Sequence, residues 1–272
     1  MFQTIWTKGA GKAMTSLLQV DNLVKNFGGL TAVSDVSLHL NNNELVALIG
    51  PNGAGKTTLF NLLTGVIPAT SGSIVLKGTN GTFALNDKKA YQIAKLGLSR
   101  TFQNIRLFKN LSVIDNVLIA MTSRYKEGFL SSIFRLPNYY KTEQRVTEDA
   151  KKLLALFELE DQTDVLAKNL PYGTQRRLEI VRALATKPQI LFLDEPAAGM
   201  NPEETANLTQ LILKVQHRFH ITILLIEHDM SLVMNLAERI YVLDHGSLLA
   251  EGNPDEIKSN PKVIKAYLGE GE

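Results

Sequence analysis

The sequence predicts an α/β fold with a parallel-sheet core and a small antiparallel β lobe. Two observations predict the core. A glycine-rich loop at residues 50–58 follows the apolar run 45–49 and precedes a helix-like stretch at 59–63. In the C-terminal part of the chain, short apolar runs alternate with helix-like segments, which is typical of parallel strands joined by crossover helices. A third observation predicts the lobe: two strand-like runs lie near the N-terminus with turn residues between them.

The N-terminal part is expected to form a flexible tail followed by the lobe. Residues 1–16 are polar and slightly basic, and Met14 is an alternative start to Met1, a choice that the sequence leaves open. The strand-like runs and the turns that bound them lie at residues 17–24, 27–29, 36–40 and 41–43.

Apolar periodicity predicts the remaining elements. Strands are expected at residues 73–76, 98–102, 190–193, 221–226 and 239–243, and residues 247–251 lie between the last of these strands and a C-terminal helix. Helices are expected at residues 88–95, 112–121, 143–159, 202–219, 230–236 and 254–268. Residues 122–140 mix aromatic residues with Gly128 and Pro137, which is typical of an inserted, partly exposed segment.

The glycine-rich loop reads GPNGAGKTT and has the spacing of a phosphate-binding P-loop. Its glycines allow a tight turn, so that several N–H groups and the N-terminus of the next helix face one phosphate chain. Lys56 can reach the β- and γ-phosphates, and the Thr57 hydroxyl is placed to hold the Mg²⁺ that accompanies a nucleoside triphosphate. The predicted nucleotide-binding residues are Gly50, Pro51, Asn52, Gly53, Ala54, Gly55, Lys56, Thr57 and Thr58.

A second part of the site is predicted where the apolar run ILFLDE ends in Asp194 and Glu195. Ligands of a parallel sheet lie beyond the carboxyl ends of its strands, so these acids are expected beside the P-loop. Asp194 would hold Mg²⁺ through water. Glu195 would act as the base, or orient the water, that attacks the γ-phosphate. The alternative is a strand that ends at the surface and leaves both acids solvated.

The apolar run at 221–226 repeats this arrangement and continues into Glu227, His228 and Asp229. A single histidine is more often structural than catalytic. Here a buried strand would deliver His228 to the same sheet edge as Glu195, which favours contact with the γ-phosphate or the attacking water.

Composition excludes several other kinds of site. The 272-residue chain contains no cysteine, which rules out disulfides, thiolate metal sites and cysteine nucleophiles. Its net charge is +2, whereas nucleic-acid-binding domains usually carry a strong basic excess, so no nucleic-acid partner is expected. No apolar run reaches the roughly 18 residues that span a bilayer, and the N-terminal residues lack the apolar core of a signal peptide.

Five motifs in order, GPNGAGKTT, TFQN, LPYGTQRRLEI, ILFLDEP and IEHD, make the sequence resemble the ATP-binding subunits of ABC transporters. The resemblance implies a P-loop NTPase with a RecA-like core. One ABC ATPase domain would cover residues 17–272 and include a helical signature subdomain at about 104–185. Two such subunits would close head to tail over two ATP molecules, each site being completed by the other subunit's signature segment. ATP binding would close the pair, and hydrolysis would reopen it.

The same resemblance implies roles outside the P-loop. Phe27 stands where the family stacks an aromatic ring on adenine, the alternative being a turn aromatic that caps the lobe. Gln103 stands where a glutamine touches Mg²⁺ and senses the membrane subunit. Pro171 replaces the serine of the usual LSGGQ and removes its hydroxyl and backbone N–H. Gly173 and the following helix still offer a positive end to the partner's phosphate. Asn201 replaces an aspartate that is usual in the cross-dimer loop.

The segments PYG, QRRLEI and EPAAGMNP and the ending VIKAYLG are similar to those of the larger ATPase subunit of branched-chain amino-acid importers. That likeness implies ATP and Mg²⁺ as cofactors. The implied partners are two membrane permeases, a second related ATPase subunit and, indirectly, an extracytoplasmic solute-binding protein. The subunit would lie at the cytoplasmic face of a prokaryotic inner membrane. Residues 104–111 are expected to dock the permease, with Phe108 either an apolar anchor or a core residue.

Related classes carry some of these motifs. ATPases of urea or amide importers and of lipopolysaccharide exporters are alternatives, so the cargo, the direction of transport and the homo- or heterodimer remain open. DNA-repair ATPases carry a long coiled coil between the glutamine and the signature, for which residues 103–170 are too short. Translation-associated cassette proteins normally join two cassettes, whereas this chain has one P-loop. A P-loop kinase or GTPase would need an acceptor site or a guanine-reading motif.

Overall fold

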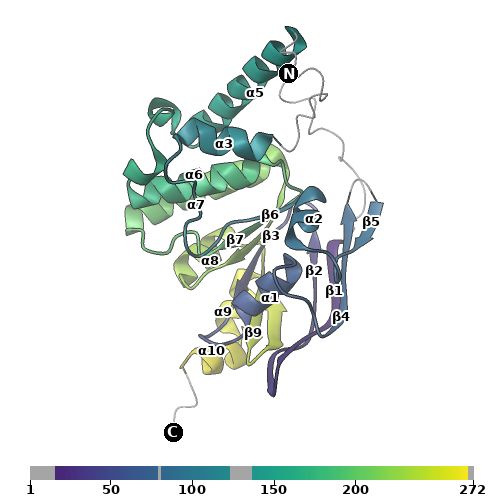
Figure 1. Cartoon of the computed structure of the whole chain (residues 1–272). Coiled ribbons are helices and arrows are strands. Elements are labelled where there is room, and N and C mark those ends of the chain that lie inside the picture. Colours follow the sequence, from purple (N-terminus) through teal and green to yellow (C-terminus); the bar gives the residue numbers. More distant parts are fainter. Residues whose placement is uncertain (1–15, 79–80, 123–136, 269–272) are drawn as a thin grey trace.

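The structure, a computed structural model, describes residues 16–78, 81–122 and 137–268 as two β-sheets with helices packed around them (Figure 1). The larger sheet confirms the predicted α/β core and has the strand order β10-β9-β3-β8-β7-β6. Its strands pair in parallel, except that β10 runs antiparallel to β9. They are β3 (Leu45–Ile49), β6 (Leu98–Arg100), β7 (Ile190–Asp194), β8 (Thr222–Ile226), β9 (Arg239–Asp244) and β10 (Ser247–Gly252).

Apolar runs form the centre of this sheet because both of its faces are covered. Every residue of β3, β7 and β8 is buried, as is usual for parallel strands with layers on both sides. Alternate side chains enter different clusters: Leu45 and Ala47 join the cluster on the helical side, whereas Val46 and Leu48 pack with the second sheet. The larger sheet therefore forms the middle layer of the molecule.

The second sheet is the predicted antiparallel lobe, with the order β2-β1-β4-β5. Its hairpin is longer than expected, since the second strand begins at Leu30 rather than at residue 36. Polar residues in this stretch obscure the alternation, while several register shifts let the main chains keep pairing. The strand at 81–84 was not predicted. The strands are β1 (Ser16–Phe27), β2 (Leu30–Asn41), β4 (Ser71–Gly78) and β5 (Gly81–Ala84).

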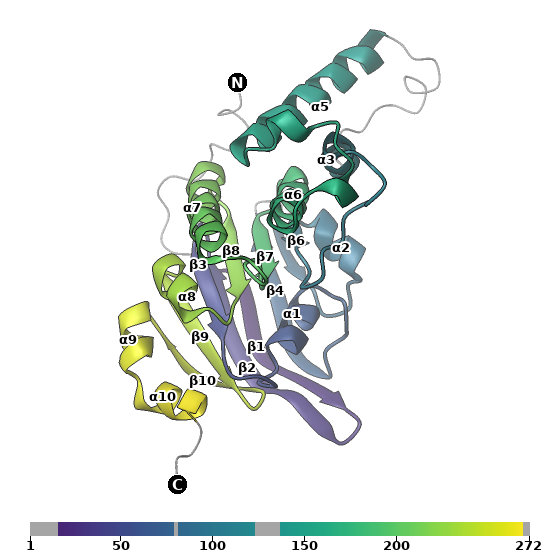
Figure 2. The same cartoon turned by 90° about the vertical axis from the view of Figure 1, so that its left-hand side faces the viewer.

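The helices divide into groups by position. Figures 1 and 2 place α3, α5 and α6, which contact one another, at one end of the molecule, and α9 and α10 at the other end beside β10. With the 3₁₀ turns Glu160–Gln162 and Ala167–Asn169, the first group occupies the segment predicted as the helical subdomain. The helices are α1 (Lys56–Leu63), α2 (Ala90–Lys95), α3 (Val113–Met121), α5 (Pro137–Leu156), α6 (Tyr172–Ala185), α7 (Pro202–Phe219), α8 (Met230–Leu236), α9 (Pro254–Ser259) and α10 (Pro261–Leu268).

Several boundaries differ from the prediction. Ser16 starts β1 instead of ending the tail, whose other residues lie outside the described ranges. Helix α5 begins at Pro137, inside the predicted insert, of which residues 123–136 lie outside the described ranges. The helix predicted at 254–268 is divided, because Asn260 has an extended backbone and Pro261 starts a new helix. Within the described ranges, no helix combines the length and apolar character needed to cross a bilayer.

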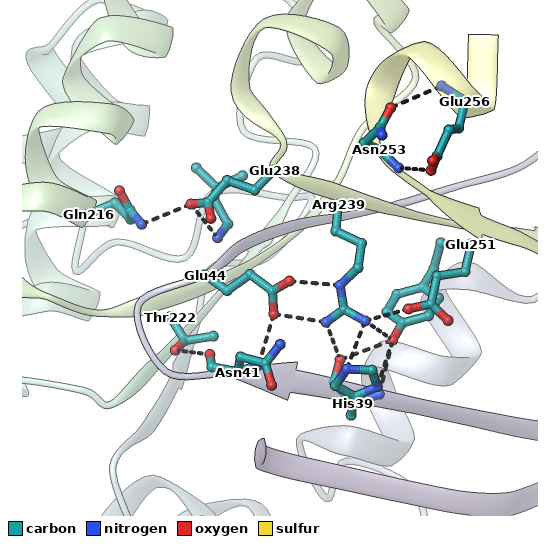
Figure 3. Close-up of polar contacts among 12 residues, drawn as sticks. His39, Asn41, Glu44, Gln216, Thr222, Glu238, Arg239, Glu251, Asn253 and Glu256 are labelled. Atoms are coloured by element: carbon teal, nitrogen blue, oxygen red, sulfur yellow. Dashed lines mark hydrogen bonds and ion pairs between the residues drawn. The ribbon is translucent and has the colours of Figure 1, made fainter. Parts of the chain in front are cut away.

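A polar network joins the two sheets at the edge where β3 and β9 begin (Figure 3). The Arg239 guanidinium donates to both carboxylate oxygens of Glu44, at 2.7 and 2.8 Å, and to Oε1 of Glu251 at 2.5 Å. It also donates to the main-chain oxygen of His39 at 2.9 Å. Burial acts to lower the pKa of Arg239, but these carboxylate bonds outweigh burial and raise it. The guanidinium therefore stays charged and ties together strands β2, β9 and β10.

Candidate active site

The P-loop connects β3 to α1 in a backbone path that requires glycine. Gly50 has φ +151°, and a Cβ atom there would lie 2.0 Å from the main-chain oxygen of Leu243. Gly55 caps α1 with φ +99°, and its Cβ would lie 2.5 Å from the oxygen of Ala32. Both positions therefore exclude larger residues. The loop passes close to β9 and β2 and delivers the N-terminus of α1 to the sheet edge.

Lys56 lies over the P-loop and is largely buried. Its Nζ donates to the oxygen of Gly50 at 2.7 Å and to that of Pro51 at 2.9 Å. Burial lowers the pKa of Lys56, and the negative charge of Glu195 opposes this shift. Thr57, the next residue, is exposed in the first turn of α1. The predicted cation and hydroxyl thus stand together at the start of this helix.

Asp194 ends β7 and is 3% exposed, so the alternative of a solvated strand end is wrong for this residue. Its Oδ2 accepts a hydrogen bond from Nη2 of Arg100 at 2.9 Å. Burial raises the pKa of Asp194, and Arg100 opposes the shift. Nη1 of Arg100 also donates to Asn61 at 2.8 Å and to Thr64 at 3.0 Å, both on the α1 side. Arg100 therefore fixes the acidic strand end against the P-loop helix.

Glu195 lies between two other predicted site residues. Its Oε2 accepts from Nε2 of Gln103 at 3.1 Å, and its Oε1 lies 2.8 Å from Nε2 of His228. Glu195 has φ +48°, which is uncommon for a residue with a side chain, and its N–H donates to the oxygen of Ile226 at 2.9 Å. The structure thus brings together three residues from separate parts of the chain.

Sequence reasoning missed the role of Glu227. This carboxylate is buried and accepts from the backbone N–H groups of Ala197, at 2.9 Å, and His228, at 3.1 Å. Burial raises the pKa of Glu227, and these backbone bonds oppose the rise. Glu227 joins the loop after Glu195 to the loop that carries His228. The acid directly before the predicted histidine was the available signal.

Three other predicted residues lie on other elements. Phe27 ends β1 and is 49% exposed, and Nζ of Lys25 lies 5.0 Å from its ring centroid. Gly173 is buried in the first turn of α6, where a Cβ would lie 2.9 Å from Oε1 of Glu204. Phe108 is 48% exposed, so its alternative as a core residue is wrong.

Two departures from the usual ABC motifs lie at helix N-caps. Pro171 is the N-cap of α6, and this helix starts without a side-chain cap. Asn201 is the N-cap of α7 and forms a reciprocal pair with Glu204: Asn201 Oδ1 accepts from the Glu204 N–H at 2.9 Å, and Glu204 Oε2 accepts from the Asn201 N–H at 3.0 Å. Asn201 therefore caps α7 with its side-chain amide, and a carboxylate is not needed at this position.

The fold and the site belong to a known class. The family model described as "ABC transporter" matches residues 33–198, and one described as "Branched-chain amino acid ATP-binding cassette transporter" matches residues 247–272. The chain belongs to the ABC transporter family and is an ATPase of that type.

Within this family, the chain is similar to LivG, a high-affinity branched-chain amino acid transport ATP-binding protein, from Salmonella typhimurium. The two are 48% identical over 254 residues, which cover 93% of this chain and 98% of LivG. BraF of Pseudomonas aeruginosa, a protein of the same description, is 45% identical over 254 residues and is covered to 98%. Among solved structures, the ADP conformation of MJ1267, an ATP-binding cassette of an ABC transporter, superposes with a TM-score of 0.79 at 33% identity. That match covers 94% of this chain and 100% of MJ1267.

Proposed function

We propose that this chain hydrolyses ATP to power an importer of branched-chain amino acids. The observation that carries the ATPase site is the placement of Glu195 between Gln103 and His228, beside the P-loop. The names and high identity of the LivG and BraF relatives support the cargo. A family model for branched-chain amino acid cassettes matches residues 247–272, which lie outside the P-loop region. This match supports the cargo independently.

In this proposal the P-loop and Phe27 bind ATP. The exposed Phe27 ring would stack on adenine. Backbone N–H groups of residues 50–58 would surround the phosphates, while Lys56 would move from the Gly50 and Pro51 oxygens to the β- and γ-phosphates. This exchange costs little, because phosphate oxygens replace carbonyl oxygens as acceptors of the same ammonium group.

The residues beside the P-loop fit Mg²⁺. Thr57, Gln103 and Asp194 supply a hydroxyl, an amide and a carboxylate, and oxygen donors of this kind suit Mg²⁺. Among the described residues, no group of three or more His, Asp and Glu side chains could hold a metal by itself. A site with one buried carboxylate matches the usual mode of Mg²⁺ binding, in which phosphates and water complete the shell. When bound, the metal would neutralise charge on the β- and γ-phosphates.

Glu195 would activate the attacking water. Its carboxylate would accept a proton from the water as the water oxygen bonds to the γ-phosphorus and the bond to the ADP oxygen breaks. Gln103 and His228 contact its two oxygens and so orient the carboxylate. His228 would also contact the γ-phosphate, which would lie beyond the same strand ends.

The second half of each ATP site would come from another subunit. Gly173 and the N-terminus of α6 would face the ATP of a second ABC ATPase subunit. The pair would bind two permeases at the cytoplasmic face of the inner membrane as peripheral subunits, and a solute-binding protein would deliver the cargo outside. The exposed Phe108 is the proposed apolar anchor for a permease.

Uptake of labelled leucine tests this proposal. Cells lacking the gene would be complemented with the wild type or with Glu195→Gln, and both proteins would be quantified to show equal amounts. We expect the wild type alone to restore uptake. If the deletion leaves leucine uptake unchanged while the purified protein hydrolyses ATP, the cargo assignment is wrong. Uptake of urea, amides and other amino acids, together with lipopolysaccharide export, would then identify the cargo.

A further inference from the structure

Two buried charged residues of α6 hold the segment that carries Gln103. The side chains of Arg176 and Glu179 are 0% and 2% exposed. Arg176 donates from Nη1 to the main-chain oxygen of Phe102 at 2.7 Å and from Nη2 to that of Gln103 at 2.8 Å. Oε1 of Glu179 accepts from the backbone N–H groups of Phe102, at 3.4 Å, and Arg106, at 3.2 Å. The two side chains, called the α6 clamp below, therefore grip only the main chain of this segment.

Stability does not explain the α6 clamp. Nη1 of Arg176 and Oε2 of Glu179 form an ion pair at 2.9 Å, but the desolvation of buried charges offsets most of their attraction. In addition, Nε of Arg176 is buried and has no hydrogen-bond partner in the part of the chain that the structure describes. An unsatisfied buried donor is costly. The effect of the pair is geometric. It fixes the carbonyl groups of Phe102 and Gln103 and the N–H groups of Phe102 and Arg106, in a loop that has no regular secondary structure.

The position of this loop decides where the Gln103 amide lies. Its Nε2 donates to Oε2 of Glu195, whose other oxygen lies against His228. A line of contacts thus runs from Arg176 through the Gln103 main chain and side chain to Glu195. Helix α6 also begins at Tyr172, next to the predicted contact with the partner's ATP, so one rigid helix faces both features.

We propose that Arg176 and Glu179 are positioning residues for ATP hydrolysis: they hold the Gln103 main chain so that its amide orients Glu195. This inference rests on the roles proposed above for Gln103 and Glu195. A displacement of about 1 Å in a positioned group can lower a rate by about 100-fold. The α6 clamp therefore acts on turnover more than on ATP binding, because none of its bonds involves the P-loop.

The test uses the full-length chain with ATP and Mg²⁺. The variants are Arg176→Gln, Arg176→Lys and Glu179→Gln, and each is measured for kcat, KM and the urea midpoint of unfolding. Arg177→Gln is the matched control, since this neighbouring arginine of α6 meets the exposed Glu158 at 3.3 Å. We expect kcat to fall by about 10- to 100-fold in the Gln variants, with KM changed by less than about 3-fold and Arg177→Gln unaffected. Lysine at position 176 should restore part of the loss, because it can still donate to a carbonyl.

A double-mutant cycle with Gln103→Ala separates positioning from general disruption. If Arg176 acts through Gln103, Arg176→Gln lowers kcat no further in the Gln103→Ala background. Additive losses overturn the inference, as does normal kcat in a folded Arg176→Gln variant. If Arg176→Gln does not fold, Glu179→Gln and Arg176→Lys are each combined with Gln103→Ala in the same double-mutant cycle. Glu195→Gln is measured in parallel: unchanged kcat there refutes the proposed site, whereas a loss there with normal kcat in the clamp variants refutes only the clamp.

Discussion

At the scale of single residues, Glu195 is the proposed base. Glu195→Gln keeps the size of the side chain and removes the proposed base, while glutamine can still bond to Gln103 and His228. We expect kcat to fall by about 100- to 10,000-fold, the usual contribution of a general base, with ATP affinity retained. Single-turnover hydrolysis and equilibrium binding of ATP measure the two quantities separately. A closed, ATP-bound dimer should accumulate in gel filtration, and unchanged turnover would remove Glu195 from the catalytic role.

Lys56 should act on binding instead. Lys56→Ala removes the ammonium group that bonds to the Gly50 and Pro51 oxygens of the P-loop. A hydrogen bond to a charged group contributes about 1.5–3 kcal/mol, so ATP affinity should fall by about 10- to 100-fold. Isothermal titration with ATP measures the change. Lys77→Ala, which alters an exposed lysine on β4 that bonds to Gln19, is the control and should bind normally. Equal affinity in both variants would show that Lys56 does not reach the phosphates.

Arg100 illustrates what sequence reasoning cannot find at this scale. Its partner Asp194 lies 94 residues further along the chain, and the pattern LSR gives no sign of that contact. Arg100→Met should lower the free energy of unfolding by about 3–5 kcal/mol, because it leaves a buried carboxylate without its cation. Urea denaturation measures this loss. Arg177→Met, which breaks an exposed ion pair, should cost less than about 1 kcal/mol.

Measuring Arg100→Met in a second background, Asp194→Asn, identifies the cause of that loss of stability. In an Asp194→Asn background, Arg100→Met should cost clearly less, because no buried charge is left unpaired. An equal cost in both backgrounds would assign the effect to lost packing of the Arg100 side chain.

At the scale of elements, prediction from the sequence was most accurate for strands that are buried along their whole length. Strands β3, β7 and β8 are buried throughout and almost entirely apolar, so their positions and the acids at the ends of β7 and β8 were predicted from the pattern alone. The first half of β2 mixes apolar and polar residues without regular alternation and is exposed or partly exposed at most positions, and its pairing with β1 makes it a strand. Tertiary pairing therefore outweighed the local pattern at this position.

Helix caps allow a matched pair of variants at this scale. Asn201→Ala removes the side chain that accepts from the Glu204 N–H at the start of α7 and should cost about 1 kcal/mol of stability. Asn201→Asp keeps the acceptor and restores the carboxylate usual in the family, so stability should be retained. Asn253→Ala removes the same kind of cap from α9 and should cost a similar amount. Urea midpoints measure all three changes. A loss in Asn201→Asp equal to that in Asn201→Ala would contradict the capping role.

At the scale of the whole molecule, the two ends of the strands in the larger sheet differ in what they carry: the candidate site lies at the carboxyl ends, and the Arg239 network lies at the end where β3 and β9 begin. The P-loop, Asp194 and the loop with His228 follow the carboxyl ends of β3, β7 and β8. This gathering was predictable, because one rule for parallel sheets applies to every strand. The contacts that hold the site were not predictable: Arg176 reaches Gln103 across 73 residues and from a helix whose pattern shows only an arginine pair. The rule for sheets thus locates the site, while its rigidity depends on contacts between distant elements.

Residues near the other end of these strands make the stability of the whole chain depend on pH. Tyr241 of β9 is buried, and its hydroxyl contacts Arg239 and the main chain of His39. Burial raises its pKa to about 12, against the smaller opposing effects of the His39 backbone and the Arg239 charge. Between pH 10 and 12, the unfolded chain releases this proton while the folded chain keeps it, so folding becomes less favourable as pH rises.

Comparing the wild type with Tyr241→Phe tests this dependence. A shift of roughly two pKa units corresponds to at most about 2–3 kcal/mol of unfolding free energy, lost progressively from about pH 10 to about pH 12. Urea denaturation at several pH values measures it. Lysines titrate in the same range in both proteins, so only the difference between them reports Tyr241. That difference should decline with pH, because phenylalanine has no proton to release. Parallel pH profiles would show that the Tyr241 hydroxyl is not held neutral by the fold.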